Sequence, residues 1–129
     1  MKILDTDHCI AVIRGQLQLT HHLQSGVELA VTVISIGELV HGAEKSDRPV
    51  HHRVMVDAVL ASLKVLPFEL EAARHFGELK AVLERSGMRL ADIDLQIASI
   101  ALQHQSPLVT HTRRHFQRIP RLILEDWIA

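Results

Sequence analysis

Short apolar segments alternate with longer amphipathic stretches along the whole of this 129-residue chain. Segments rich in β-branched and other apolar residues, which fit strands, lie at 2–4, 29–33, 64–66, 107–110 and 122–124. Stretches with helical spacing of apolar residues lie between them, at about 6–14, 16–24, 35–43, 50–62, 69–85 and 92–104. Strands separated by helices pair in parallel through right-handed crossovers. The alternation therefore predicts an α/β fold with a short, mostly parallel central sheet flanked by helices.

Chain length and composition restrict the classes of protein further. We expect a single domain over residues 1–129, because this length supplies one hydrophobic core. The net charge of −1 gives no global positive field of the kind that marks many nucleic-acid binders. The lone Cys9 excludes an intrachain disulfide and suits a reducing compartment. With no signal-peptide pattern and no uncharged apolar run of membrane length, we expect a cytoplasmic protein.

Carboxylates stand at the junctions where predicted strands give way to helices. Asp5 follows the first strand, Glu38 lies four residues past the apolar run 31–34, and Asp92 and Asp94 open a helical stretch. The carboxyl ends of parallel strands share one edge of the sheet, where open α/β folds bind ligands. Acids brought together at that edge repel one another unless a cation lies between them. The pattern therefore predicts a divalent metal site and, with it, phosphoryl chemistry.

Asp5 and Glu38 each have a purely structural alternative. Asp5 could cap the following helix, although Thr6 and Asp7 fit that role better, and a buried carboxylate must be paired or face a cleft. Ser35 and Glu38 form an S-x-x-E pattern, which is typical of a capping box. Taken alone, that pattern favours a helix-capping role for Glu38 in the first helical turn.

Asp92 and Asp94 are two residues apart, so on a helix they point to different sides. Asp92 fits a helix N-cap. Asp94 shares its face with the apolar residues Ile97 and Ala101. Because a carboxylate on an apolar stripe is expected to be paired or bound to metal, Asp94 is the better ligand candidate.

Two basic features occur near the carboxyl terminus. His111 and His115 have i, i+4 spacing, which occurs in some zinc sites. Without a cysteine pair or an intervening Glu the spacing supports zinc only weakly, and the two residues are better interpreted as surface histidines. The tract 111–121 holds four Arg residues and no acid. It is either an exposed basic face or, on the same sheet edge as the acids, a surface that holds a phosphate backbone.

Six segments, taken together and in order, carry a resemblance to a known family. They are Ile3-Leu4-Asp5-Thr6-Asp7, the run 34–43 with its Gly-Glu-Leu, Leu66-Pro67-Phe68, the run 91–98, Leu108-Val109-Thr110 and Leu124-Glu125-Asp126-Trp127. The chain resembles PIN domains and, among them, the VapC toxins of type II toxin–antitoxin systems. The resemblance extends over essentially the whole chain.

The resemblance implies an endoribonuclease that depends on Mg²⁺ or Mn²⁺, with Asp5, Glu38 and Asp94 as metal ligands and Asp92 as a supporting acid. One position departs from the family pattern, because Thr112 stands where an Asp or Asn is common. A hydroxyl can position water or a phosphate oxygen but is a poor metal ligand, so one or two metal sites remain possible.

The resemblance also implies partners and RNA contacts. Arg113, Arg114 and Arg118 are expected to contact phosphates of an RNA substrate. A small VapB-like antitoxin is expected to insert a segment against the acidic cleft, the toxin is expected to form a homodimer, and no membrane partner is expected.

Two alternative functions follow from the same residues. The chain could be a PIN-fold module that binds RNA or protein with weak or no nuclease activity, because Thr112 replaces the fourth acid. It could also be a phosphoacceptor receiver domain, which needs an Asp at the end of the middle strand and a Lys at the end of the last. The third predicted strand is followed by Pro67, and no Lys follows the fifth, so the receiver pattern fits poorly.

Overall fold

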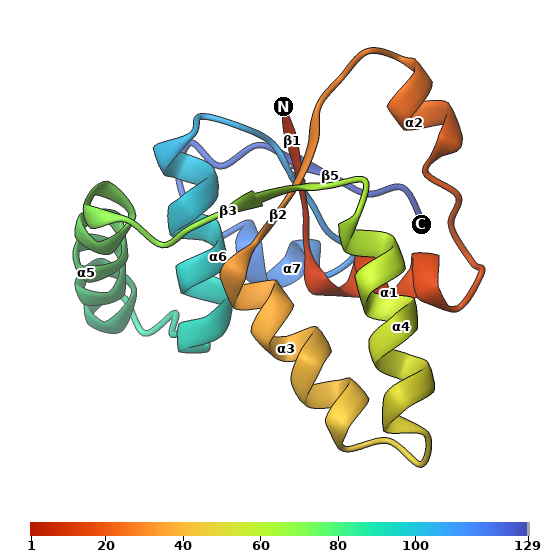
Figure 1. The fold of residues 1–129 in the computed structure, drawn as a ribbon. Coiled ribbons are helices and arrows are strands. Elements are labelled where there is room, and N and C mark those ends of the chain that lie inside the picture. The colour runs from red at the N-terminus through yellow and green to blue at the C-terminus, as the bar shows by residue number, and fades with distance from the viewer. Residues whose placement is uncertain (129) are drawn as a thin grey trace.

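A computed structural model describes residues 1–128 and shows strands and helices alternating along the chain (Figure 1). Within these residues the strands are β1 (Lys2–Leu4), β2 (Leu29–Thr32), β3 (Lys64–Leu66), β4 (Leu108–Val109) and β5 (Leu124–Glu125). The helices are α1 (Thr6–Ile13), α2 (Thr20–Gln24), α3 (Val33–Glu44), α4 (Pro49–Leu60), α5 (Leu70–Arg85), α6 (Asp92–Gln103) and α7 (Arg113–Phe116). The predicted α/β class is confirmed.

The strands form one parallel sheet in the order β3-β2-β1-β4-β5. The chain runs outward from β1 through β2 to β3 and then returns to the other side of β1 as β4. Such a reversal opens a crevice at the carboxyl ends of the two strands that flank it. Because Leu4 pairs with Val109, the residues that follow them, Asp5 and Thr110, lie next to each other at this crevice.

Helices cover both faces of the sheet. Successive strand residues point to opposite sides, and because those on both sides are apolar, each face needs a helical layer to bury it. In β1, Ile3 belongs to a cluster with α5, α6 and α7, whereas Leu4 belongs to a cluster with α1, α3 and α4. Both side chains are fully buried. Continuous apolar strands of this kind are typical of a parallel sheet enclosed by two helical layers.

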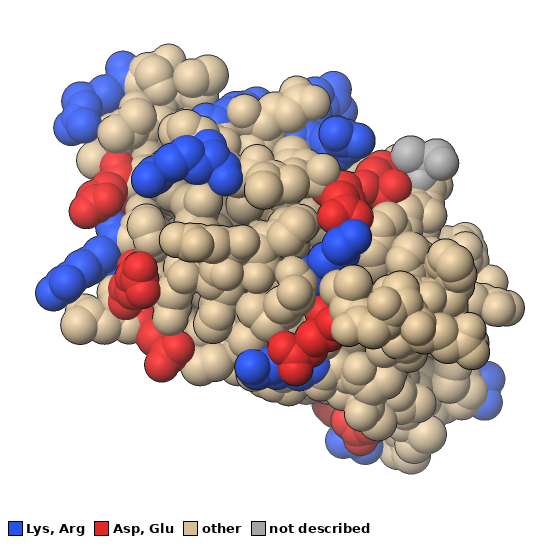
Figure 2. Space-filling model, turned by 90° about the horizontal axis from the view of Figure 1, so that it is seen from above, with Lys and Arg blue, Asp and Glu red and all other residues tan. Residues whose placement is uncertain are grey.

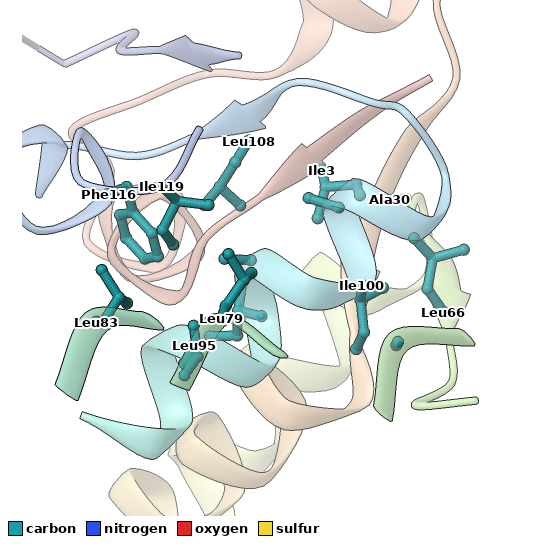
Figure 3. Packing of buried hydrophobic residues seen from close by; sticks show 14 residues of the cluster. Ile3, Ala30, Leu66, Leu79, Leu83, Leu95, Ile100, Leu108, Phe116 and Ile119 are labelled. Carbon is teal, nitrogen blue, oxygen red and sulfur yellow. The ribbon is translucent and has the colours of Figure 1, made fainter. Parts of the chain in front are cut away.

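The core on the α5–α6 side anchors the turn that carries the basic tract (Figure 3). Phe116 of α7 is fully buried and shares a cluster with Ile119, Leu83 of α5 and Leu108 of β4. Burying a phenylalanine side chain stabilises a fold by about 1.5–3 kcal/mol. The buried side chain of Phe116 therefore anchors this short helix to the core.

The end of α1 explains why the second predicted helix is too long. Gly15 adopts a φ of 73°, and the N–H groups of Gln16 and Leu17 both donate to the carbonyl of Ala11. A glycine in this left-handed conformation turns the chain so that the N–H groups after it reach the last carbonyls of the helix, and the helix ends there. The next residues therefore close α1, and only Thr20–Gln24 of the predicted 16–24 is helical.

The start of α3 lies two residues before the predicted one. Thr32 is the N-cap, since its hydroxyl oxygen accepts a hydrogen bond from the N–H of Ser35 at 3.2 Å. Strand β2 therefore passes directly into the helix at Val33. In contrast, β5 begins at Leu124, two residues later than the predicted segment 122–124.

The surface charges are mixed. Viewed from above Figure 1, basic and acidic side chains alternate around a largely uncharged centre, and neither sign forms a continuous field on that face (Figure 2). This distribution agrees with the net charge of −1. Within residues 1–128, no helix combines the length and apolar character needed to cross a bilayer.

Candidate metal centre

Asp5 lies at the carboxyl end of β1, where the strand gives way to α1. Its carboxylate accepts hydrogen bonds from the N–H of Thr6 at 2.8 Å and from the hydroxyl of Thr110 at 2.7 Å. The first bond makes Asp5 itself the N-cap of α1, so the prediction that Thr6 or Asp7 fills that role is wrong. The reason is that α1 begins directly after β1, which leaves Asp5 as the one residue at the junction.

The Asp5 carboxylate is destabilised by its surroundings. Only 6% of the residue is exposed, and burial together with the nearby charges of Asp7 and Asp94 raises the pKa of Asp5 from 3.8 to about 6. Within the described residues, no Lys or Arg forms an ion pair with Asp5. A buried carboxylate with acidic neighbours and no protein cation is a site that a metal ion would stabilise.

Glu38 reaches the same edge from α3. The hydroxyl of Thr6 donates to Glu38 Oε1 at 2.6 Å and lies 2.9 Å from the hydroxyl of Ser35. Because Thr32 caps the helix, Glu38 lies in its second turn, and the capping-box interpretation is wrong. Its carboxylate instead faces the first turn of α1, one residue from Asp5.

The two acids of α6 are separated as their spacing predicts, but Asp92 is not a cap. Ala91 is the N-cap, and Asp92 forms an exposed ion pair with Lys80 at 3.0 Å. Asp94 is half-buried, lies 3.5 Å from His115 Nδ1 and contributes to the raised pKa of Asp5. The structure therefore places Asp94 near Asp5 and directs Asp92 towards α5.

Asp7, which was expected to cap α1, is a further residue of this site. Its Oδ2 accepts hydrogen bonds from the N–H of His111 at 3.0 Å and the hydroxyl of Thr112 at 3.1 Å. Burial raises the pKa of Asp7, but the bonds from His8, His111 and Thr112 outweigh it, and the net pKa is lowered. The hydroxyl of Thr112 is thus directed at a carboxylate. The sequence feature that could have indicated a site role for Asp7 is its position as a second acid two residues after Asp5.

The basic tract follows β4 and turns along α7. Arg113 and Arg114 are exposed, whereas Arg118 donates from Nη1 to the carbonyl of Arg89 at 2.7 Å. His111 and His115 each face an acid, Asp126 at 2.9 Å and Asp94 at 3.5 Å, so they do not converge on one site. The preference for surface histidines over a zinc pair agrees with this geometry.

The donor set fits a hard cation better than zinc. In residues 1–128, no three side chains of the His, Cys, Asp or Glu type converge closely enough to bind one ion together. Structural zinc needs four such ligands, and catalytic zinc needs three. Mg²⁺ instead keeps several waters and binds one or two carboxylates. Asp5 with Asp94 or Glu38 meets that requirement.

Comparison with known proteins identifies the family of the chain. The family model described as PIN domain matches residues 2–122. This chain belongs to the PIN-domain family. The chain is 32% identical over 129 residues to ribonuclease VapC2 of Rickettsia felis. It is 33% identical over 130 residues to the tRNA(fMet)-specific endonuclease VapC of Salmonella typhimurium. Each alignment covers 97% of this PIN domain and 96% of the relative, which confirms the predicted VapC resemblance.

Solved structures give the same result for the fold of this PIN domain. The structure of VapBC2 from Rickettsia felis bound to a promoter DNA fragment superposes with a TM-score of 0.89 at 30% identity, covering 98% of both chains. DNA-bound VapBC from Salmonella typhimurium gives 0.89 at 32% identity, covering 98% of this chain and 97% of that one. The predicted PIN-like architecture is confirmed.

Proposed function

We propose that this PIN domain is a metal-dependent endoribonuclease that acts as the toxin of a toxin–antitoxin pair in the cytoplasm. The observation that carries the proposal is the buried Asp5 carboxylate, which has Asp7 and Asp94 as neighbours and no protein cation beside it in residues 1–128. A phosphodiester would be repelled from such acids without a cation between them. The curated relatives, which are named as ribonucleases, support the same function.

The residues of the crevice have distinct roles in this proposal. Asp5, together with Asp94 or Glu38, would hold Mg²⁺ or Mn²⁺, with water filling the remaining coordination positions. When bound, the ion supplies an activated water and neutralises charge at the phosphate. Thr110 and the N–H of Thr6 orient the Asp5 carboxylate.

The direct test is cleavage of a stem-loop RNA by the purified chain, with the divalent metal first removed by EDTA and then returned. We expect cleavage in Mg²⁺ or Mn²⁺, none in EDTA, and recovery when the metal is restored. Undiminished cleavage in EDTA would contradict the proposal. RNA binding without cleavage under every metal condition would favour the second candidate, a PIN-fold binding module, which the lack of three converging ligands in residues 1–128 also supports.

The basic tract predicts a salt-dependent RNA contact. Arg113 and Arg114 are exposed beside the crevice, so replacing both with Ala should remove two phosphate contacts. For single-stranded RNA we expect the slope of log affinity against log salt, which is negative, to become less steep by about 1.4. Fluorescence anisotropy in EDTA measures it without cleavage. Arg118→Ala should change the slope less, because Arg118 already donates to a backbone carbonyl.

A groove beside Glu38 is the surface that best fits an antitoxin. It has a volume of about 300 Å³ between α1, α3 and α4, and its lining includes Ile10, Ile13, Leu39 and Val56 with Glu38. A second hollow of about 350 Å³ also has Glu38 in its lining. A segment with an apolar face and a terminal cation would fill the groove and neutralise Glu38. A VapB-like partner is supported by the VapBC complexes among the similar structures.

Replacing Ile13 with Glu is expected to relieve inhibition by the antitoxin while leaving RNA cleavage intact. The half-buried Ile13 lines the groove, so a charge there would be buried under the bound segment. The apparent inhibition constant, measured with a VapB-like protein encoded beside this chain, should rise by about tenfold or more. Val54→Glu, on an exposed part of α4 outside this groove, is the matched control. Equal inhibition of both variants would exclude this groove as the antitoxin site. The homodimer stays a prediction.

A further inference from the structure

His8 is a fully buried histidine in the first turns of α1, and both of its ring nitrogens have partners. Nδ1 lies 2.8 Å from Asp7 Oδ1, and Nε2 lies 3.0 Å from the backbone N–H of Trp127. A backbone N–H can only donate, so Nε2 must accept. With Nε2 accepting, Nδ1 carries the proton and donates it to Asp7.

This bond fixes one oxygen of Asp7 and leaves the other for the loop after β4. Asp7 Oδ2 accepts from the N–H of His111 at 3.0 Å and from the hydroxyl of Thr112 at 3.1 Å, and it lies 3.3 Å from the hydroxyl oxygen of Thr110. The single hydroxyl proton of Thr110 goes to its shorter contact, Asp5 at 2.7 Å. The orientation of Asp7 therefore sets the position of the loop whose threonine holds Asp5.

The carboxyl-terminal segment holds the same loop from the other side. Asp126, whose side chain is 3% exposed, accepts hydrogen bonds from His111 Nδ1 at 2.9 Å and from the N–H of Ile128 at 3.0 Å. The ring of Trp127 stacks on His22 of α2, with centroids 3.6 Å apart and planes 5° apart. Residues 126–128 are thus fixed against both α1 and α2.

We propose that His8 and Asp126 are positioning residues that hold the 110–112 loop, through Asp7 and His111, so that Thr110 orients Asp5. Because His8 is fully buried, it acts without touching RNA. The inference rests on the proposed nuclease function. It assigns a role to the terminal Asp126-Trp127 pair, which the proposed metal centre does not use.

The test compares two replacements of His8. Asn carries an N–H close to the position of Nδ1 and can still donate to Asp7, whereas Leu removes both hydrogen bonds. We expect His8→Leu to lower the cleavage rate constant by about 10–100-fold, the range typical of outer-shell partners at metal sites, with RNA affinity in EDTA changed less than twofold. His8→Asn should recover most of that rate. His75→Leu, on α5 and away from this network, is the control.

Two further measurements test the hydrogen bonds of His8 and the order of the 110–112 loop without RNA cleavage. Nitrogen chemical shifts should place the ring proton of His8 on Nδ1 and show Nε2 as an acceptor. Amide hydrogen exchange at His111 and Thr112 should quicken at least tenfold in His8→Leu and stay near wild type in His8→Asn. If His8→Leu does not fold, Asp126→Asn replaces it, because it removes the charge that holds His111, and exchange at His111 should again quicken.

The outcomes separate the two proposals. A wild-type chain that cleaves RNA, with His8→Leu equally active, would overturn the positioning role and leave the nuclease function standing. Unchanged exchange at His111 in both His8→Leu and Asp126→Asn would overturn it as well. If wild type does not cleave RNA, the nuclease function fails, and the exchange measurements alone decide whether the network holds the loop.

Discussion

Replacing Asp5 with Asn should abolish RNA cleavage and at the same time stabilise the metal-free fold. Even outer-shell partners of a metal typically contribute 10–100-fold, so losing a direct ligand should lower the cleavage rate by more than about 100-fold. The Asn side chain can still accept from the N–H of Thr6, which preserves the start of α1. Cleavage in Mg²⁺ measures the first effect.

The stability effect follows from the pKa of Asp5, which is raised from 3.8 to about 6. Between these pH values the folded state binds more protons than the unfolded state, so wild-type stability falls as pH rises through this range. Asn carries no charge, so the variant does not lose stability as the pH rises through this range. At pH 7.5 in EDTA we expect Asp5→Asn to raise the free energy of unfolding by about 1–3 kcal/mol, since one pKa unit corresponds to 1.36 kcal/mol.

Urea denaturation from pH 4 to 8 measures this difference, which should shrink towards zero near pH 4. Asp57→Asn, an exposed acid of α4, is the control and should show little change at any pH. An Asp5→Asn variant that cleaves RNA at the wild-type rate, or that is less stable than wild type at pH 7.5 in EDTA, would contradict the assignment of Asp5.

Glu38→Gln should remove RNA cleavage with little effect on folding. The carbonyl oxygen of Gln can still accept the hydrogen bond that Thr6 donates at 2.6 Å, so the contact between α1 and α3 is retained. The negative charge that Glu38 would offer to the proposed metal ion is lost. We expect the cleavage rate to fall by more than about 100-fold, again above the outer-shell range.

Glu44→Gln on the same helix is the matched control for Glu38. Glu44 is half exposed and pairs with Arg53 at 3.0 Å, and a surface pair of this kind contributes about 0.2–1 kcal/mol. Cleavage by Glu44→Gln should equal wild type. If Glu38→Gln were equally active, Glu38 would serve only to anchor Thr6 and would not be a metal ligand.

The parts of the fold that depend on periodicity were predictable from the sequence. Alternation of strand and helix patterns predicts the parallel sheet, and the strand ends predict where Asp5 lies. The apolar face of α6 likewise distinguishes the inward Asp94 from the exposed Asp92. These features follow from local patterns because burial of one face determines both the element and its orientation.

Helix starts and the hydrogen-bond network were not predictable in the same way. Ser35 and Glu38 match a capping box, but Thr32 satisfies the helix start first, and a short pattern cannot show which of two hydroxyls does so. The network joins His8 to Trp127, 119 positions later. Such a contact depends on where β5 brings the chain end.

The most direct test of the metal centre is the binding of Mn²⁺ to the purified chain, followed by electron paramagnetic resonance. We predict saturable binding by wild type, with the signal of free Mn²⁺ suppressed, and the same binding by Asp57→Asn. Asp5→Asn should lose at least about tenfold in Mn²⁺ affinity. Equal Mn²⁺ binding by wild type and Asp5→Asn would contradict the account that Asp5 holds the catalytic metal.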